Sequence, residues 1–113
     1  MVMILLPAAL IAAQAYQGEL RERLAAPIVE EFDSAKKAYD LEVCVADALT
    51  VLGTPTAFRD GPDNIVIAAS MPSGNAYLAA VTISKSGDGS HLALRLRGKG
   101  WNDRLRSRIS GCL

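Results

Sequence analysis

Apolar and polar residues alternate through the middle of the chain, between residues 56 and 97. A period of two is typical of β-strands, because successive side chains of a strand point to opposite faces of a sheet. Turn-forming stretches separate the alternating segments, with the sequences DGPDN, MPSGN and KSGDGS. Short turns between consecutive strands predict an antiparallel meander. The four expected strands are Thr56–Arg59, Ile65–Ser70, Ala76–Ser84 and His91–Arg97.

On both sides of these strands the apolar period lengthens to three or four residues, which predicts amphipathic helices. The first helix is expected from about Asp33, with Asp33 or Ser34 capping its first amides. Gly53 is expected to close it in a left-handed conformation, and Pro55 prevents its continuation. The expected fold is therefore α+β, in the order α-β-β-β-β-α, with both helices on one face of the sheet. Their apolar positions are Leu41, Cys44, Val45, Ala48 and Leu52 in the first helix, and Trp101, Leu105, Ile109 and Cys112 in the second.

The first fifteen residues carry no charge, and their apolar run, Val2–Ala13, falls short of the roughly 20 residues that span a bilayer. Ala13-Gln14-Ala15 has the small-x-small pattern of a signal-peptidase site, although no basic residue precedes the run. We therefore interpret residues 1–15 as a cleaved signal peptide, with an uncleaved membrane anchor as the alternative. The boundaries that follow are 16–32 for an N-terminal tether or loose helix and 33–113 for a single α+β domain.

Two cysteines, Cys44 and Cys112, fall on the apolar sides of the two predicted helices. An even cysteine count in an exported chain predicts a disulfide, which here would link these helices. The two positions are 68 residues apart (112 − 44). Closing so long a loop contributes about 4 kcal/mol in the chain-entropy model. If the chain is not exported, two reduced core cysteines are the alternative.

The charges are sorted along the chain, although the formal net charge is zero. Residues 16–63 contain ten acidic and five basic residues, a net charge of −5, while residues 64–113 contain two acidic and seven basic residues, a net charge of +5. This asymmetry either marks an anion-binding surface or attracts the two halves of the fold to each other. Few aromatic residues are present to stack on bases, so an acidic ligand or a protein is a more suitable partner than nucleic acid. The candidate anion-binding residues are Arg95, Arg97, Lys99, Arg104, Arg106 and Arg108.

One face of the predicted sheet is apolar but is built from small side chains. Such a face is too apolar for comfortable contact with water and too poor in large residues for a full core, so it predicts a docking surface. A homodimer is the simplest use of it. The residues of this face are Val66, Ala68, Leu78, Ala80 and Ala93, together with Thr82.

His91 is the single histidine and the one candidate for catalysis. Ser86, Asp88 and Ser90 lie beside it, but residues so close in sequence seldom reach the geometry of a catalytic triad. One histidine and two distant cysteines do not form a standard zinc site, and the glycine-rich turns match no phosphate-binding loop. The sequence therefore predicts no metal and no cofactor.

The favoured interpretation is a small exported, disulfide-stabilised binding or interaction module, periplasmic or extracellular, of the envelope-accessory or inhibitor kind and without catalysis. One alternative is a small hydrolase that uses His91. Another is a membrane-tethered subunit with an uncleaved N-terminus, the one case in which membrane contact is expected.

Overall fold

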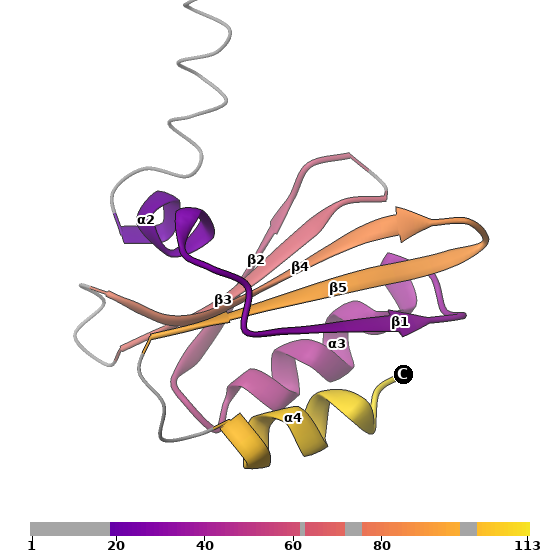
Figure 1. Ribbon diagram of the computed structural model, residues 1–113. Coiled ribbons are helices and arrows are strands. Elements are labelled where there is room, and N and C mark those ends of the chain that lie inside the picture. The colour runs from indigo at the N-terminus through magenta and orange to yellow at the C-terminus, as the bar shows by residue number, and fades with distance from the viewer. Residues whose placement is uncertain (1–18, 62, 72–75, 98–101) are drawn as a thin grey trace, which may run out of the picture.

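A five-stranded antiparallel sheet lies at the centre of the structure, with helices on both of its faces (Figure 1). This computed structural model describes residues 19–61, 63–71, 76–97 and 102–113, and residues 1–15 and Lys99 lie outside these ranges. Within them, no helix combines the length and the apolar character that crossing a bilayer requires. The helices are α2 (Glu19–Ala25), α3 (Ala38–Leu49) and α4 (Asn102–Ser110). The strands are β1 (Glu30–Ser34), β2 (Thr54–Arg59), β3 (Ile65–Ser70), β4 (Tyr77–Ser86) and β5 (Gly89–Leu96).

The α+β class and the antiparallel meander are confirmed, but the sheet has five strands rather than the expected four. Strands β2 to β5 pair in sequence order, and β1 adds to the edge beside β5, giving the order β1-β5-β4-β3-β2. The sequence of β1, EEFDS, contains one apolar residue, Phe32, so it offers no readable alternation. Its strand conformation depends instead on the backbone partners that β5 supplies, with Phe32 opposite Leu92.

Helix α3 begins at Ala38, later than expected, because Asp33 and Ser34 belong to β1. The carboxylate of Asp33 hydrogen-bonds His91, and the hydroxyl of Ser34 donates to the carbonyl of Leu113. Both side chains are therefore used in bonds between distant segments. Lys37 occupies the N-cap position of α3 and makes no side-chain cap bond.

Gly53 is required for close approach of two backbone segments, and the left-handed conformation expected there is wrong. Among the described glycines, Gly61 and Gly87 have positive φ. A Cβ on Gly53 would overlap the carbonyl oxygen of Ser70, so the chain entering β2 passes directly against the end of β3. Gly87, with φ 59°, supports the tight turn between β4 and β5.

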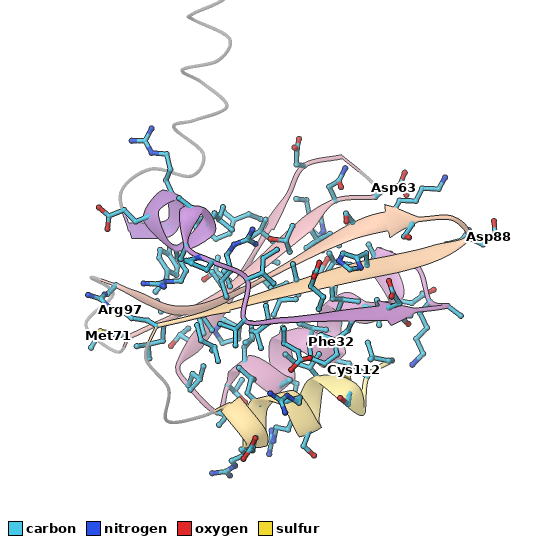
Figure 2. All side chains as sticks on the ribbon, viewed as in Figure 1. Phe32, Asp63, Met71, Asp88, Arg97 and Cys112 are labelled. Carbon is cyan, nitrogen blue, oxygen red and sulfur yellow. A yellow bond between two sulfur atoms is a disulfide. The ribbon has the colours of Figure 1, made fainter. Side chains whose placement is uncertain are left out.

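Helices α3 and α4 cover the same face of the sheet, as expected, and form the main core with it (Figure 2). One row of side chains across three neighbouring strands points to this face, and its members are at most 1% exposed: Ile67, Val81 and Leu94. Leu41 and Leu105 meet them from the two helices. Large aliphatic side chains thus fill the space between the layers.

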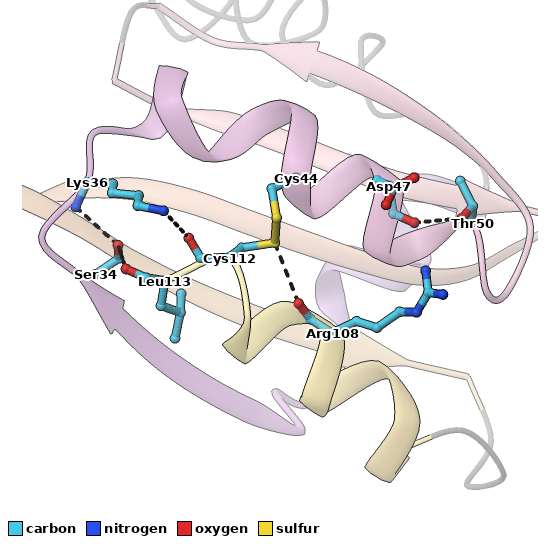
Figure 3. The surroundings of a disulfide bond; sticks show 8 residues. All are labelled: Ser34, Lys36, Cys44, Asp47, Thr50, Arg108, Cys112 and Leu113. Carbon is cyan, nitrogen blue, oxygen red and sulfur yellow. Dashed lines mark hydrogen bonds between the residues drawn. A yellow bond between two sulfur atoms is a disulfide. The ribbon is translucent and has the colours of Figure 1, made fainter.

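The predicted disulfide is present and joins Cys44 of α3 to Cys112, two residues beyond the end of α4 (Figure 3). It closes a separation of 68 residues. Beside it, the ammonium group of Lys36 donates to the carbonyl of Cys112 at 2.8 Å. The bond from Ser34 to Leu113 lies next to this one, so the C-terminus is fastened to α3 covalently and to the end of β1 by hydrogen bonds.

Candidate functional site

The face of the sheet opposite α3 and α4 carries the residues that we expected to form a docking surface. Pairing between β3, β4 and β5 aligns their side chains in rows across the strands. One row runs through Ala93, Thr82 and Val66, and the next runs through Arg95, Ala80 and Ala68. Alternation along each strand places both rows on this face.

Helix α2 packs on part of this face (Figure 1). Leu20 is 2% exposed and forms a small apolar cluster with Val66, Ala68 and Ala80, and Leu24 packs against its edge. The expected docking surface is therefore occupied in part by a segment of the same chain. Leu78 is half-buried in β4 and belongs to neither apolar cluster. The spacing of Leu20 and Leu24, one helical turn apart, is the signal by which α2 was identifiable in the expected tether.

Beside α2 the same face is open and forms a groove of about 390 Å³, which we call the α2 groove. Val66, Thr82 and Ala93, which form one cross-strand row, contribute to its lining. Leu24 lines it from α2, and Asp60 and Asn64 line it from the β2–β3 connection. The complete lining is Leu24, Asp60, Asn64, Ile65, Val66, Thr82, Ala93 and Arg95.

Arg95 is the one cation among the residues that line this groove. Its Nε donates to the carbonyl of Ala26 at 3.0 Å, and its Nη1 donates to the hydroxyl of Thr82 at 3.4 Å. Both acceptors are neutral, and in the described part of the chain no carboxylate forms an ion pair with Arg95. The side chain is half-buried, so water provides only part of its solvation.

The candidate arginines of the last helix do not join Arg95 in one surface. Arg104, Arg106 and Arg108 belong to α4, on the opposite face of the sheet. Arg106 is ion-paired with Glu30, with Nε and Oε1 2.7 Å apart. Arg97 is exposed at the end of β5. Arg95 and the arginines of α4 are close in sequence but lie on opposite faces of the sheet.

His91 lies between two carboxylates of the neighbouring strand β1. Its Nδ1 is 2.9 Å from Asp33 Oδ1, and its Nε2 is 2.8 Å from Glu31 Oε1. These hydrogen bonds, that of Asp33 first and that of Glu31 second, raise the pKa of His91 above its ordinary value of 6.5. A histidine that bonds a carboxylate through each ring nitrogen is doubly protonated, because each nitrogen must donate.

This arrangement does not resemble a catalytic triad. General-base catalysis requires one ring nitrogen to accept the proton of a nucleophile, and here each nitrogen faces a carboxylate. Ser84 and Ser90, the neighbouring serines with described hydrogen bonds, donate to the backbone carbonyls of His91 and Lys36. Glu31 and Asp33 are the partners that sequence reasoning missed, since both lie on the unrecognised strand β1.

A second hollow, of about 360 Å³, lies at the β4–β5 turn beside the start of α3. Lys37 and Lys85 line it, but Asp63 and Asp88 line it too, so its charges are balanced. Across the described ranges, no three His, Cys, Asp or Glu side chains are grouped so as to hold a metal ion. The α2 groove also has one acid, Asp60, beside its one cation. It remains the stronger candidate because more of its lining is apolar, namely Leu24, Ile65, Val66 and Ala93.

No protein-family model matches the chain, and neither a curated protein nor a solved structure is significantly similar to it.

Proposed function

We propose that the protein is a small exported binding module, stabilised by its disulfide, that holds its ligand in the α2 groove and catalyses no reaction. The observation that carries this proposal is the groove itself: an open, partly apolar hollow of about 390 Å³ beside a half-buried arginine. Its volume falls within the range of small-molecule sites, about 300–1,000 Å³. Apolar lining with a few polar groups is the usual construction of such sites.

Two observations support export. Disulfides persist mainly in oxidising compartments, and the Cys44–Cys112 bond joins α3 to the segment that follows α4. The uncharged N-terminal run ends in Ala13-Gln14-Ala15, the pattern that signal peptidase recognises. We expect the protein isolated from its native host to begin at Tyr16. An intact mass that retains Met1 would contradict processing.

The absence of catalysis is proposed because His91 is engaged by Asp33 and Glu31 through both ring nitrogens. If the protein is a binding module, His91→Ala leaves ligand affinity largely intact. If it is a hydrolase, the same change abolishes its activity.

Ligand retention tests the assignment of the site. The full chain is purified from its native host, and co-purifying small molecules are identified by mass spectrometry. The groove variant Ala93→Leu adds bulk to the lining, while Val43→Arg changes a residue that is 79% exposed on α3, on the other face of the sheet. We expect a ligand that the wild type and Val43→Arg retain and Ala93→Leu loses. Equal retention by all three proteins would place the ligand elsewhere.

A further inference from the structure

Arg95, like Arg23 and Lys36, bonds neutral oxygens and not the carboxylates that Arg59 and Arg106 have as partners. Arg59 pairs with Glu42, and Arg106 pairs with Glu30. Arg95 is half-buried and has only neutral oxygen acceptors among the described residues. Partial burial weakens the solvation of a charge, and a neutral acceptor compensates less than a carboxylate does.

The acids of the neighbouring strand β1 on the same face are already engaged. Glu31, which pairs across the strands with Ala93, hydrogen-bonds His91, and Asp33 does the same from the other side of the ring. The guanidinium group keeps N–H groups beyond the two that bond Ala26 and Thr82. An anion in the groove would accept from these N–H groups in charge-assisted hydrogen bonds.

The shape of the groove indicates that the anionic group is attached to an apolar chain. From Ala93 the groove crosses β4 at Thr82 and reaches Val66 on β3. Two inter-strand spacings amount to about 10 Å, a length that an octanoate chain spans. Asp60 lines the groove with Asn64 of the β2–β3 connection, so a second negative charge at that end would be repelled.

We infer that the α2 groove binds a small amphiphile, with its single carboxylate on Arg95 and its apolar chain over Ala93, Thr82 and Val66. This inference rests on the proposed function, because it names the ligand class of the same site.

The test titrates the isotopically labelled full chain, expressed with its own N-terminal segment, with four probes of matched chain length. Octanoate carries one carboxylate, octan-1-ol no charge, octylamine a cation and octanedioate two carboxylates. We expect octanoate to bind most tightly and to shift the backbone amide resonances of Val66, Thr82 and Ala93. Equal affinity for octanoate and octylamine, or shifts confined to other segments, would overturn the inference.

Matched variants then test the role of Arg95. Arg95→Gln is expected to weaken octanoate binding by about tenfold or more, the usual contribution of a hydrogen bond to a charged group, and to leave octan-1-ol binding unchanged. Arg104→Gln removes an exposed arginine from the other face and should change neither. If Arg95→Gln and Arg104→Gln bind octanoate alike, the inference is wrong.

A third variant covers the case in which Arg95→Gln fails to fold. Ala93→Leu keeps the arginine and is expected to weaken octanoate and octan-1-ol together, because it fills the floor that both chains contact. Unchanged binding of octanoate to Ala93→Leu would also overturn the inference. If octanoate fails while the native ligand is still retained in a manner sensitive to Ala93→Leu, the proposed function stands and only the carboxylate assignment falls.

Discussion

The two faces of the sheet differ in how firmly they are covered. Among the described residues, the face beneath α3 and α4 belongs to a cluster of sixteen buried residues, while the α2 face belongs to a cluster of four. The first face presents large aliphatic side chains and is closed by two helices and a disulfide. The second presents alanine and threonine beneath a helix of seven residues.

This difference separates stability from binding within one sheet. Alternation along β3, β4 and β5 sends large residues to one side and small ones to the other. Apolar area removed from water scales with side-chain size, so the α3–α4 face contributes most of the hydrophobic stabilisation. The α2 face is left with room for the groove, and loss of its cover should leave the main core folded.

The largest expected change in stability follows from removing the disulfide, which lies on the α3–α4 face. The double variant Cys44→Ser/Cys112→Ser should lose about 4 kcal/mol of unfolding free energy, because the bond closes a separation of 68 residues. Equilibrium denaturation in guanidinium measures this loss. The wild type in reductant should lose a similar amount. Equal unfolding midpoints for the oxidised wild type and the double variant would show that the bond does not stabilise the fold.

Truncating one buried leucine on each face compares the faces directly. Leu105 of α4 is 0% exposed, and Leu105→Ala should cost about 3 kcal/mol of unfolding free energy. Leu20 of α2 is almost as buried, at 2%, yet Leu20→Ala should cost less than half as much. The reason is that α2 can undock without unfolding the rest, which limits the cost to its docking free energy.

The double variant Leu20→Ala/Leu24→Ala serves as the control for that limit. Once α2 has undocked, a second truncation on it no longer removes a contact. The loss of unfolding free energy in the double variant should therefore be smaller than the sum of the two single losses. Equal losses for Leu20→Ala and Leu105→Ala would mean that α2 is integral to the core.

Ala80→Arg places a charge between the sheet and α2, where Ala80 is 0% exposed. We expect α2 to be displaced, since its short contact cannot accommodate a buried unpaired charge. Hydrogen exchange should show that the amides of α2 lose protection while those of α3 keep theirs. Val43→Arg, at a position 79% exposed, is the matched control and should change neither. Global unfolding of Ala80→Arg would contradict the separation of the two faces.

Much of the α3–α4 side of the fold could be predicted from the sequence. Strands β3 and β4 are rich in β-branched residues and are bounded by strong turn sequences, so both could be identified as strands, although residues 65–69 of β3 are apolar throughout. Cys44 and Cys112 lie on the apolar sides of separate helical patterns, which was enough to place both helices on one face. These strand and helix patterns are clear in the sequence because they are formed by large apolar residues.

The α2 side could be predicted only in part, since its signals are small or depend on distant partners. Strand β1 has a single apolar residue and forms because β5 offers it an edge. Helix α2 is too short to be stable alone and is held by tertiary packing. Sequence order grouped Arg95 with the arginines of α4, but the sheet places them on opposite faces. Residues 16–32 were expected to form a tether or a loose helix, but the packing of α2 on the small residues of the sheet was not foreseen.

The smallest expected effect is a pH dependence on the α2 face, where His91 joins β5 to β1. Hydrogen bonds to Asp33 and then Glu31 raise the pKa of His91 in the folded protein above 6.5. The stabilisation is therefore fully present below about pH 6.5, the pKa of an unfolded histidine, and is lost as pH rises through the higher pKa of the folded state. Unfolding free energy should fall over this window, because neutral imidazole donates through one nitrogen and leaves one carboxylate without its bond.

Urea denaturation at a series of pH values checks this dependence, with His91→Gln as the matched variant. Glutamine keeps a donor for one carboxylate but does not titrate, and the chain contains no other histidine, so the slope should vanish in the variant. The effect should be small, because the His91 side chain is 34% exposed and its partners are more exposed still. Above the window the two proteins should approach equal stability. If the slope persists unchanged in His91→Gln, the pH dependence comes from other groups. In that case β1 is held to β5 by their backbone pairing and by the packing of Phe32 on the main core.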